Sequence, residues 1–411
     1  MHFTEFALNK PILKAIFEKN YDTPTDVQIE TIPLVLAKKD VVVSAQTGTG
    51  KTAAFALPIL QLLFHQQDSN VNAKHIRALV ISPTRELAVQ IEEEFKDYGK
   101  YTNLKSTCVF GGTSIEAQKN ILRKGVDILI ATPGRLLDLR KQEVINFDKV
   151  EVLVLDEADL MLDMGFIDDV QKIERMCPET KQTLLISATM PAKVVQLART
   201  ILTEPERVEI TPDVAAAKSV NQLLYYVAKP DKIELCLQLL RKEIEGNILI
   251  FRRTKNGVEK LEQTLLKNDF KAESLHGDKT QSARQKALNN FKNGEVNILI
   301  ATDVASRGID IEDLDAVINF DLPNIPETYI HRIGRTGRAG KTGTSYSFCA
   351  PDEKSYVSSI QKLIKKSIPV VEDHPYVLDP KAKPEVHKKK GSKHKSGRKS
   401  AASKKNKKRW Y

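Results

Sequence analysis

An octapeptide near the amino end of the chain has the composition of a phosphate-binding loop. It follows the apolar run Val41–Ser44, which predicts a buried strand, and precedes residues 53–57, which predict the start of a helix. Its glycines allow backbone N–H groups to turn toward an anion at the helix N-terminus. In such a loop the lysine reaches the β- and γ-phosphates, and the hydroxyl that follows it binds Mg²⁺. The eight residues are Ala45, Gln46, Thr47, Gly48, Thr49, Gly50, Lys51 and Thr52.

Two acidic residues follow another apolar run about a hundred residues later in the chain. Val152–Leu155 predicts a buried strand, and Asp156 and Glu157 come directly after it. Asp156 at the strand tip is placed to hold Mg²⁺ opposite Thr52, while Glu157 can orient and polarise an attacking water. We expect this strand to be a neighbour of the strand that leads into the phosphate loop. Taken alone, the loop could be an ordinary turn with chance glycines, and the two acids could belong to an exposed acidic turn. The first alternative stays open because Ala45 stands where the generic loop has glycine.

Both motifs need strands that end at one edge of a sheet. Short apolar runs alternate with helical stretches, which predicts a parallel sheet covered by helices on both faces, with chemistry at the carboxyl ends of the strands. Residues 1–40 predict a helical lead-in with a break at 21–25. The first series of runs comprises residues 41–44, 78–82, 107–110, 128–131, 152–155 and 184–187. The second comprises residues 248–251, 273–275, 298–301, 316–319 and 345–349.

The two series predict two related α/β domains in tandem. The pentapeptide Ile-Leu-Ile-Ala-Thr occurs at residues 128–132 and again at 298–302, each time at the end of a predicted strand. We expect a first domain at residues 1–207, a linker at 208–220 and a second domain at 221–371. Because only the first domain has a phosphate loop, the natural ligand site is a cleft between the two.

Positive charge is concentrated at the carboxyl end. The net charge is +10, yet residues 381–411 hold 14 of the 63 Lys and Arg and a single acid, so they carry +13 and the other 380 residues carry −3. Residues 372–411 are rich in Lys, Ser, Gly and Pro, which predicts a disordered basic tail. Such a tail can tether a nucleic acid through its phosphates, act as a solubility segment, or serve as a nuclear-import signal.

The spacing of the cysteines and the hydropathy of the chain indicate the cellular compartment of the protein. The four cysteines lie far apart and form no CxxC pair, which argues against a zinc site or a disulfide framework and favours a reducing compartment. The amino terminus lacks the pattern of a signal peptide, and no apolar run approaches the roughly 18 residues of a membrane helix. We expect a soluble cytoplasmic protein without a membrane association.

The run Asp156-Glu157-Ala158-Asp159 resembles the motif that names the DEAD-box ATP-dependent RNA helicases. Other motifs of that family follow in family order along residues 1–370. In the first domain they are Phe3 with residues 20–28, residues 83–87, Gly111-Gly112, residues 132–135 and residues 187–189. In the second domain they are residues 251–254, 281–284, 301–310 and 331–338. Asn20 stands where the family usually has glycine, and Asn tolerates left-handed backbone conformations well. Residues 363–369 and the basic tail look most like the bacterial RhlE-type subgroup.

The resemblance implies two tandem RecA-like domains with ATP and Mg²⁺ in the cleft between them, and it assigns candidate roles to matching residues. The candidate catalytic residues are Lys51, Asp156, Glu157, Arg335 and Arg338, the two arginines acting as fingers from the second domain. Tyr21 would stack on the base, Gln28 would read the adenine edge with its amide donors and acceptor, and Asp310 would accept from the ribose. Ser187, Ala188 and Thr189 would couple hydrolysis to unwinding. The candidate RNA-backbone residues are Thr84, Arg85, Gly111, Gly112, Thr132, Gly134, Arg135, Arg252, Thr302 and Arg307.

The function implied is an RNA-dependent ATPase that separates short RNA duplexes or remodels RNA–protein complexes. Its natural partners would be RNA and proteins of ribosome assembly or RNA decay. An ATP-gated RNA clamp whose unwinding is incidental needs the same motifs and stays open as an alternative. A translocating DNA helicase is disfavoured by residues 20–28 and by the Asp-Glu-Ala-Asp sequence. The basic run at residues 331–338 could also bind only RNA phosphates.

Overall fold

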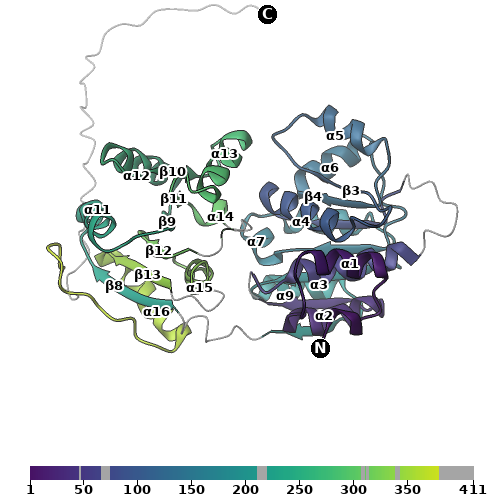
Figure 1. Cartoon of the computed structure of the whole chain (residues 1–411), viewed down its shortest axis with the longest axis horizontal. Helices are drawn as coiled ribbons and strands as arrows, with labels where there is room; N and C mark the ends of the chain where they lie inside the picture. Colours follow the sequence, from purple (N-terminus) through teal and green to yellow (C-terminus); the bar gives the residue numbers. More distant parts are fainter. Residues whose placement is uncertain are drawn as a thin grey trace, which may run out of the picture.

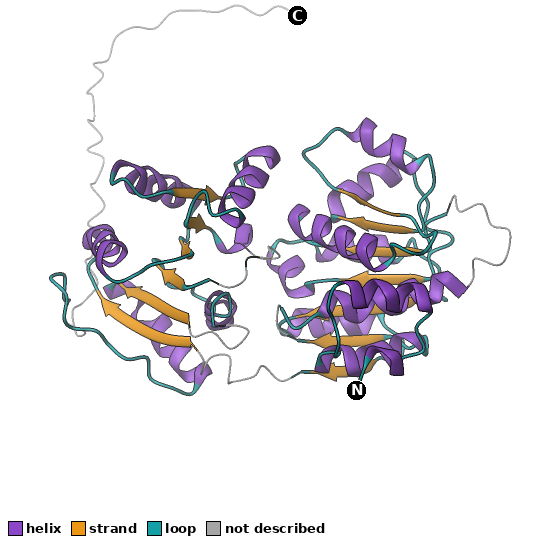
Figure 2. Ribbon diagram, in the orientation of Figure 1, coloured by secondary structure: helices purple, strands orange, loops and turns teal. Residues whose placement is uncertain are grey.

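The computed structural model describes residues 1–45, 48–65, 75–210, 220–306, 311, 314–337 and 343–378. Its strands form two sheets, each with helices on both faces, and the two domains lie beside each other (Figures 1 and 2). None of the described helices is long and apolar enough to cross a membrane.

The first sheet is all parallel and has the strand order β3-β4-β2-β5-β6-β1-β7. Its strands are β1 (Val41–Ser44), β2 (Ala78–Ile81), β3 (Ser106–Val109), β4 (Ile128–Ala131), β5 (Val152–Leu155), β6 (Gln182–Ser187) and β7 (Glu206–Glu209). Its helices are η1 (Phe3–Glu5), α1 (Lys10–Glu18), α2 (Asp26–Leu36), α3 (Lys51–His65), α4 (Arg85–Tyr98), α5 (Ile115–Leu122), α6 (Pro133–Lys141), α7 (Ala158–Asp163), α8 (Ile167–Glu174) and α9 (Ala192–Ile201). The expected α/β alternation is confirmed for this half of the chain.

The second sheet is also all parallel, in the order β10-β11-β9-β12-β13-β8. Its strands are β8 (Val220–Tyr226), β9 (Ile248–Phe251), β10 (Ala272–Leu275), β11 (Ile298–Ala301), β12 (Ala316–Asn319) and β13 (Gly343–Cys349). Its helices are η2 (Lys229–Asp231), α11 (Lys232–Lys242), α12 (Lys255–Lys267), α13 (Gln281–Lys292), α14 (Asp303–Ser306), α15 (Pro326–Ile333), η3 (Pro351–Glu353) and α16 (Lys354–Ile364). The repeated pentapeptide lies in β4 and β11, which are both second from one edge, so the two domains share their topology.

Each sheet is covered on both faces because most positions of its central strands are apolar and nearly all are buried. In β1, Val41 and Val43 pack with α1–α4, whereas Val42 faces the opposite layer with α6, α8 and α9. This alternation follows from the two-residue period of a strand, and burial on both faces is typical of parallel sheets. The motif residues then emerge only where the strands end.

Threonines start the helices that follow three of these strands. The Oγ1 of Thr84 accepts a hydrogen bond from the backbone N–H of Leu87 at the start of α4. Thr254 and Thr280 do the same for α12 and α13. A side-chain cap of this kind stabilises a helix start by roughly 1 kcal/mol, so these caps fix where each helix leaves the strand edge.

Three expectations from the sequence are corrected. The strands that precede Lys51 and Asp156 are not neighbours, because β6 lies between β1 and β5 and brings Ser187 between the two motifs. The boundary at residue 208 falls inside β7, which pairs with β1 as far as Glu209. Residues 372–378 were expected to be disordered, but the segment packs on β8: the Leu378 N–H donates to the Tyr226 carbonyl, and Tyr376 lies against the core.

Candidate functional site

A cavity of about 570 Å³ lies where the two domains meet and collects most of the predicted nucleotide residues. From the first domain it is lined by Phe3, Lys19, Tyr21, Thr23, Thr25, Gln28, Gly48, Gly50, Lys51, Thr52, Ala53, Leu87, Gln90, Glu93, Glu94, Asp97, Tyr98, Asp156 and Glu157. From the second domain it is lined by Lys292 and Arg335. Gln46, Thr47, Asp310 and Arg338, which were predicted for the same site, lie outside the described residues.

A buried ion pair forms the floor of this cavity. Lys51 begins α3, and its Nζ donates to Glu157 Oε1 at 2.8 Å. Burial alone would lower the pKa of Lys51, but the carboxylates of Glu157 and Asp156 outweigh it and raise the pKa. Lys51 therefore carries its positive charge at neutral pH and is poised to exchange a carboxylate for a phosphate.

Glu157 has an uncommon backbone conformation. Its φ of 54° and ψ of 54° place it in the left-handed region at the tip of β5. Its backbone N–H donates to Asp156 Oδ1 at 3.0 Å, which fixes the two acids against each other. Left-handed conformations of residues other than glycine are sparsely populated and cluster at functional sites. Here the conformation turns Glu157 toward Lys51.

The two adjacent carboxylates fit a site for a nucleotide-bound cation. Burial and the charge of Glu157 raise the pKa of Asp156 to about 7. A divalent cation would relieve that electrostatic penalty, and the Thr52 hydroxyl at the start of α3 lines the same cavity. Among the described residues no three His, Cys, Asp or Glu side chains group together as a metal cage. This donor set suits Mg²⁺, which keeps waters and substrate phosphates as most of its ligands.

The opposite end of the cavity is built from α2 and the turn before it. Gln28 is buried; its Oε1 accepts from the Thr25 N–H at 3.0 Å, and its Nε2 donates to the Gly50 carbonyl at 3.2 Å. Thr25 Oγ1 donates to the Thr49 carbonyl at 2.8 Å. The predicted base-reading residue thus also holds the phosphate loop. Tyr21 lies at the rim with 42 % exposure, and Asn20 has the predicted left-handed φ, 56°.

A Gln28→Ala variant is expected to bind ATP more weakly and to lose about tenfold of its preference for ATP over GTP. The Gln28 amide oxygen keeps a second lone pair and the amide nitrogen a second N–H, and a single hydrogen bond corresponds to about a factor of ten. Competition binding with both nucleotides measures the effect. An equal loss of affinity for both would show that Gln28 only supports Gly50 and the helix start.

The predicted coupling residues are joined to the last acid of the Asp-Glu-Ala-Asp run. The Thr189 N–H and Oγ1 both donate to Asp159 Oδ2, at 3.0 and 2.7 Å. The Asp159 N–H donates to Ser187 Oγ at 3.1 Å, and Ala188 lies between these two anchors. Burial alone would raise the pKa of Asp159, but the Thr189 hydrogen bond and the nearby His331 and Lys51 hold it below its usual range. His331 belongs to the second domain, so the two domains interact electrostatically at this cluster.

A buried arginine positions the second-domain side of the cavity. Arg332 in α15 donates from Nε and Nη2 to the two carboxylate oxygens of Asp303 at 2.6 and 2.8 Å. Its Nη1 donates to Asn319 Oδ1 and to the Asp321 carbonyl. These bonds tie the end of α15 to the ends of β11 and β12. Arg335, three residues further on and 6 % exposed, is thereby held at the cavity.

The predicted RNA residues of the first domain form a second cluster at the same strand edge. A Cβ added at Gly112, whose φ is +81°, would lie 2.2 Å from Arg85 Nη1. The same change at Gly111 would lie 3.7 Å from Arg85 Nη2. The Arg85 guanidinium therefore rests on the two glycines, at the start of the helix that Thr84 caps. This arrangement presents both a guanidinium fork and open backbone.

A Gly112→Ala variant is expected to bind RNA about 10- to 100-fold more weakly, because the methyl group displaces the Arg85 guanidinium and a charged hydrogen bond contributes roughly 1.5–3 kcal/mol. Gly165→Ala is the matched control: Gly165 has a φ of +77°, and no atom of the described residues lies within 4 Å of an added Cβ. Both variants should lose similar stability from the left-handed conformation, roughly 1–2 kcal/mol. Fluorescence anisotropy with labelled RNA measures binding; equal RNA affinities for the two variants would contradict the role of Gly112.

The start of α6 supplies the next predicted RNA residues. Thr132 precedes the helix, and an added Cβ at Gly134 would have no neighbour within 4 Å. No contact among the described residues therefore requires glycine there. Arg135 donates to the Thr113 carbonyl at 3.2 Å, while its buried Nη1 has no hydrogen-bond partner among the residues that the structure describes. Open backbone beside an unsatisfied guanidinium nitrogen suits an approaching phosphate.

The two RNA candidates of the second domain that the structure describes, Arg252 and Thr302, are both half-buried. Arg252 lies 3.2 Å from Asp321 through its Nε and packs 4.1 Å from the centre of the Phe320 ring. Thr302 follows β11 and is half-buried, with its N–H donating to the Leu275 carbonyl. Arg307 lies outside the described residues. The RNA roles of these three residues stay predictions, and Arg252 has a structural role in addition.

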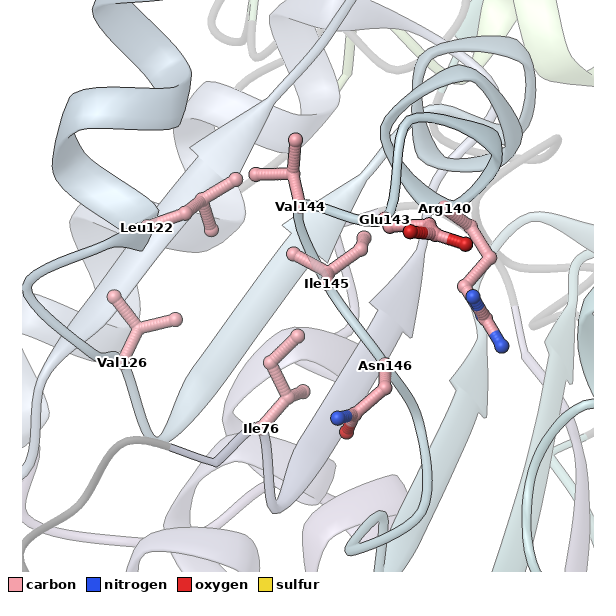
Figure 3. A pocket seen from close by; sticks show the side chains of 8 residues that line it. All are labelled: Ile76, Leu122, Val126, Arg140, Glu143, Val144, Ile145 and Asn146. Atoms are coloured by element: carbon pink, nitrogen blue, oxygen red, sulfur yellow. The ribbon is translucent and has the colours of Figure 1, made fainter.

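Two other hollows lie at the opposite edge of the first sheet. Figure 3 shows one of about 280 Å³, with an apolar floor between the ends of α5 and α6 and the residues before β2 and β4. It is lined by Ile76, Leu122, Val126, Arg140, Glu143, Val144, Ile145 and Asn146. A larger one, of about 830 Å³, lies near the starts of β1, β2, β4, β5 and β6. Neither contains a predicted site residue.

Two contacts between the domains were not predicted. Arg284 Nε in α13 lies 2.9 Å from Glu86 Oε1 in α4, and both side chains are largely buried. Lys292, at the end of α13, lines the nucleotide cavity. Residues 281–284 carried a motif signal, but Lys292 had none. Lys292 is recognised as a cavity residue only from the position of α13 relative to the first domain.

Comparison with known proteins agrees with this geometry. Residues 25–197 match the family described as DEAD/DEAH box helicase, and residues 231–340 match the helicase conserved C-terminal domain. The DEAD-box ATP-dependent RNA helicase CshA of Bacillus subtilis is 42 % identical over 366 residues, which are 89 % of this chain and 73 % of CshA.

Solved structures add the arrangement of the two domains. Dbp5 of S. cerevisiae bound to RNA and ADP BeF3 is 31 % identical and superposes with a TM-score of 0.80, over 90 % of this chain and 95 % of that one. A DEAD box protein from Methanococcus jannaschii is 39 % identical, yet its TM-score is 0.51 over 90 % of this chain and 99 % of that one. The Methanococcus jannaschii protein is more similar to this chain in sequence than Dbp5 is, yet it superposes less well. This combination indicates that its two domains are placed differently relative to each other. With its two RecA-like domains arranged as in the RNA-bound Dbp5, this chain belongs to the DEAD-box ATP-dependent RNA helicase family.

Proposed function

We propose that this chain hydrolyses ATP in the cavity between its domains and uses the cycle to separate short RNA duplexes or remodel RNA–protein complexes. The observation that carries the proposal is that Lys51 and Glu157 of the first domain share one cavity with Arg335 of the second. A site assembled from two domains is complete only when they are together. ATPase activity then depends on whatever brings the domains together.

In this proposal the residues of the first domain bind and orient ATP. The phosphates replace Glu157 as the partner of Lys51. Thr52 and Asp156 would hold Mg²⁺, which would neutralise negative charge on the phosphates. Glu157, released from Lys51, orients the attacking water and accepts its proton. Gln28 and Tyr21 hold the base at the other end. Arg335 and Arg338 donate to the γ-phosphate, and Asp310 accepts from the ribose.

RNA binding supplies the closing contact at the same strand edge. Arg85, Gly111, Gly112, Thr132, Gly134 and Arg135 would hold the RNA backbone on the first domain, with Thr84, Arg252, Thr302 and Arg307 completing the track. Such contacts position a strand without reading its sequence. The hydrogen bonds among Ser187, Thr189 and Asp159 would pass the state of the nucleotide to the second domain through His331.

The test compares ATP hydrolysis with and without RNA, and strand displacement with RNA binding. We expect RNA to stimulate hydrolysis and ATP to accelerate separation of a short duplex. A protein that holds RNA in the presence of ATP but never displaces a strand is the alternative RNA clamp. Equal stimulation by DNA would overturn the RNA-specific assignment.

The proposed domain bounds follow from the strands and their hydrogen bonds, whereas the proposed subgroup, location and substrate rest on the sequence. We assign the first domain to residues up to Glu209 and the second to residues from Val220 to 378. Residues 363–369 and the basic segment 381–411 favour the RhlE-type subgroup. The family resemblance favours RNA of ribosome assembly or decay as the substrate, and the cysteine usage favours a reducing, cytoplasmic location. Crosslinking of the protein to RNA in cells, with the bound RNAs identified, tests this assignment.

A further inference from the structure

Helix α4 carries a stripe of acidic side chains that runs between the two ligand sites. Glu86, Glu93, Glu94 and Asp97 are spaced so that they fall on one face of the helix, together with Gln90. Glu86 lies next to Arg85 in the predicted RNA site, and the other four line the nucleotide cavity. One helix face therefore connects both sites.

Helix α13 of the second domain carries basic residues with a matching spacing. Arg284 and Lys292 are eight residues apart, as are Glu86 and Glu94. Each interval corresponds to about 12 Å along a helix. Arg284 Nε lies 2.9 Å from Glu86 Oε1, and Lys292 lies at the same cavity as Glu93, Glu94 and Asp97. The ion pair places the start of α13 near the start of α4, and the end of α13 lies at the cavity that the rest of this α4 face also lines.

Helix α13 moves as part of the second domain. Its Ala287, Leu288 and Phe291 are buried against β9, β10 and β11 through Leu249, Leu275 and Leu299. Arg284 and Lys292 lie outside this packed face, so they report the position of the second domain relative to α4. When the domains separate, α4 must lose both contacts.

We propose that Lys292 is a positioning residue that pairs with the acidic face of α4 at this cavity, formed by Glu93, Glu94 and Asp97, and closes the second domain over the nucleotide. Together with the Arg284–Glu86 pair, this contact forms an interdomain ion-pair zipper with one end at the RNA site and the other at the nucleotide site. The inference rests on the proposed function. Its consequence is that RNA and ATP bind cooperatively because each stabilises the same helix pair.

A charge reversal tests the zipper in the full-length chain. Lys292→Glu is expected to raise the RNA concentration needed for half-maximal ATPase by about three- to tenfold at low salt, since an ion pair becomes a repulsion. The control is Lys286→Glu, which makes the same change on an exposed residue of the same helix outside the cavity.

A second experiment exchanges the two charges and so restores a pair of opposite sign. Glu93→Lys alone should weaken RNA activation as Lys292→Glu does, and the double variant should recover most of the lost activation. A dye pair with one dye on each domain reports closure directly with RNA and a non-hydrolysable ATP analogue. The zipper is wrong if Lys292→Glu matches Lys286→Glu, or if the double variant is no better than the single ones. Unaltered protein without RNA-stimulated ATPase would instead overturn the proposed function.

Discussion

A Glu157→Gln variant is expected to bind ATP and RNA but to hydrolyse ATP about 10²–10⁴ times more slowly than the unaltered chain, because the general base is lost. Glutamine keeps the size of the side chain, yet it neither accepts the proton of the attacking water nor carries a charge. In the structure Glu157 holds Lys51 at 2.8 Å. Without that carboxylate the phosphates meet less competition for Lys51, so ATP affinity should be equal or higher.

The variant should therefore accumulate on RNA in the ATP-bound, closed arrangement. Single-turnover hydrolysis and the lifetime of the RNA complex measure the two halves of the expectation. Glu151→Gln is the control, since Glu151 is also paired with a basic side chain, Arg77, at 2.8 Å but lies at the opposite edge of the sheet. Normal hydrolysis by Glu157→Gln would remove Glu157 from its role.

The sequence predicted the central strands well because most positions of a strand buried on both faces are apolar. It missed β7 and β8, which lie at sheet edges: in Glu206–Glu209 only Val208 is buried, and Val220–Tyr226 mixes polar and apolar residues. Edge strands need fewer apolar residues, so a search for apolar runs overlooks them. The segment at residues 372–378 was missed for a related reason, since backbone hydrogen bonds to β8 hold it there.

The candidate site was predictable to the extent that its residues follow strand ends. Asp156, Ser187 and Lys51 follow strands that end at one edge of the sheet, and they lie close together because β5, β6 and β1 are consecutive in it. The order itself was not predictable from chain order, so the position of β6 between β1 and β5 was missed. Gln28 shows a second limit: its bond to Gly50 depends on how α2 packs against the phosphate loop. Lys292 shows a third, because its position depends on the placement of one domain on the other.

An Arg335→Ala variant is expected to lose about 10³–10⁵ in the turnover of RNA-saturated protein, the range associated with an arginine finger. Arg335 is 6 % exposed at the cavity and lies at the end of a helix that Arg332 fixes to Asp303. Its charge is thus preorganised where negative charge develops on the transferred phosphate. Arg335→Lys should recover little, since an ammonium group lacks the planar fork of donors.

The effect of Arg335→Ala should fall on turnover and spare the affinity for ATP in the absence of RNA, because Lys51, Gln28 and the phosphate loop bind ATP from the first domain alone. ATP affinity without RNA and kcat at saturating RNA, measured on the same preparation, separate the two steps. A basic residue that binds only RNA phosphates would produce the opposite pattern, in which weaker RNA binding is overcome by more RNA and kcat is restored. Restoration of kcat at high RNA would therefore reject the finger and place Arg335 on the RNA track.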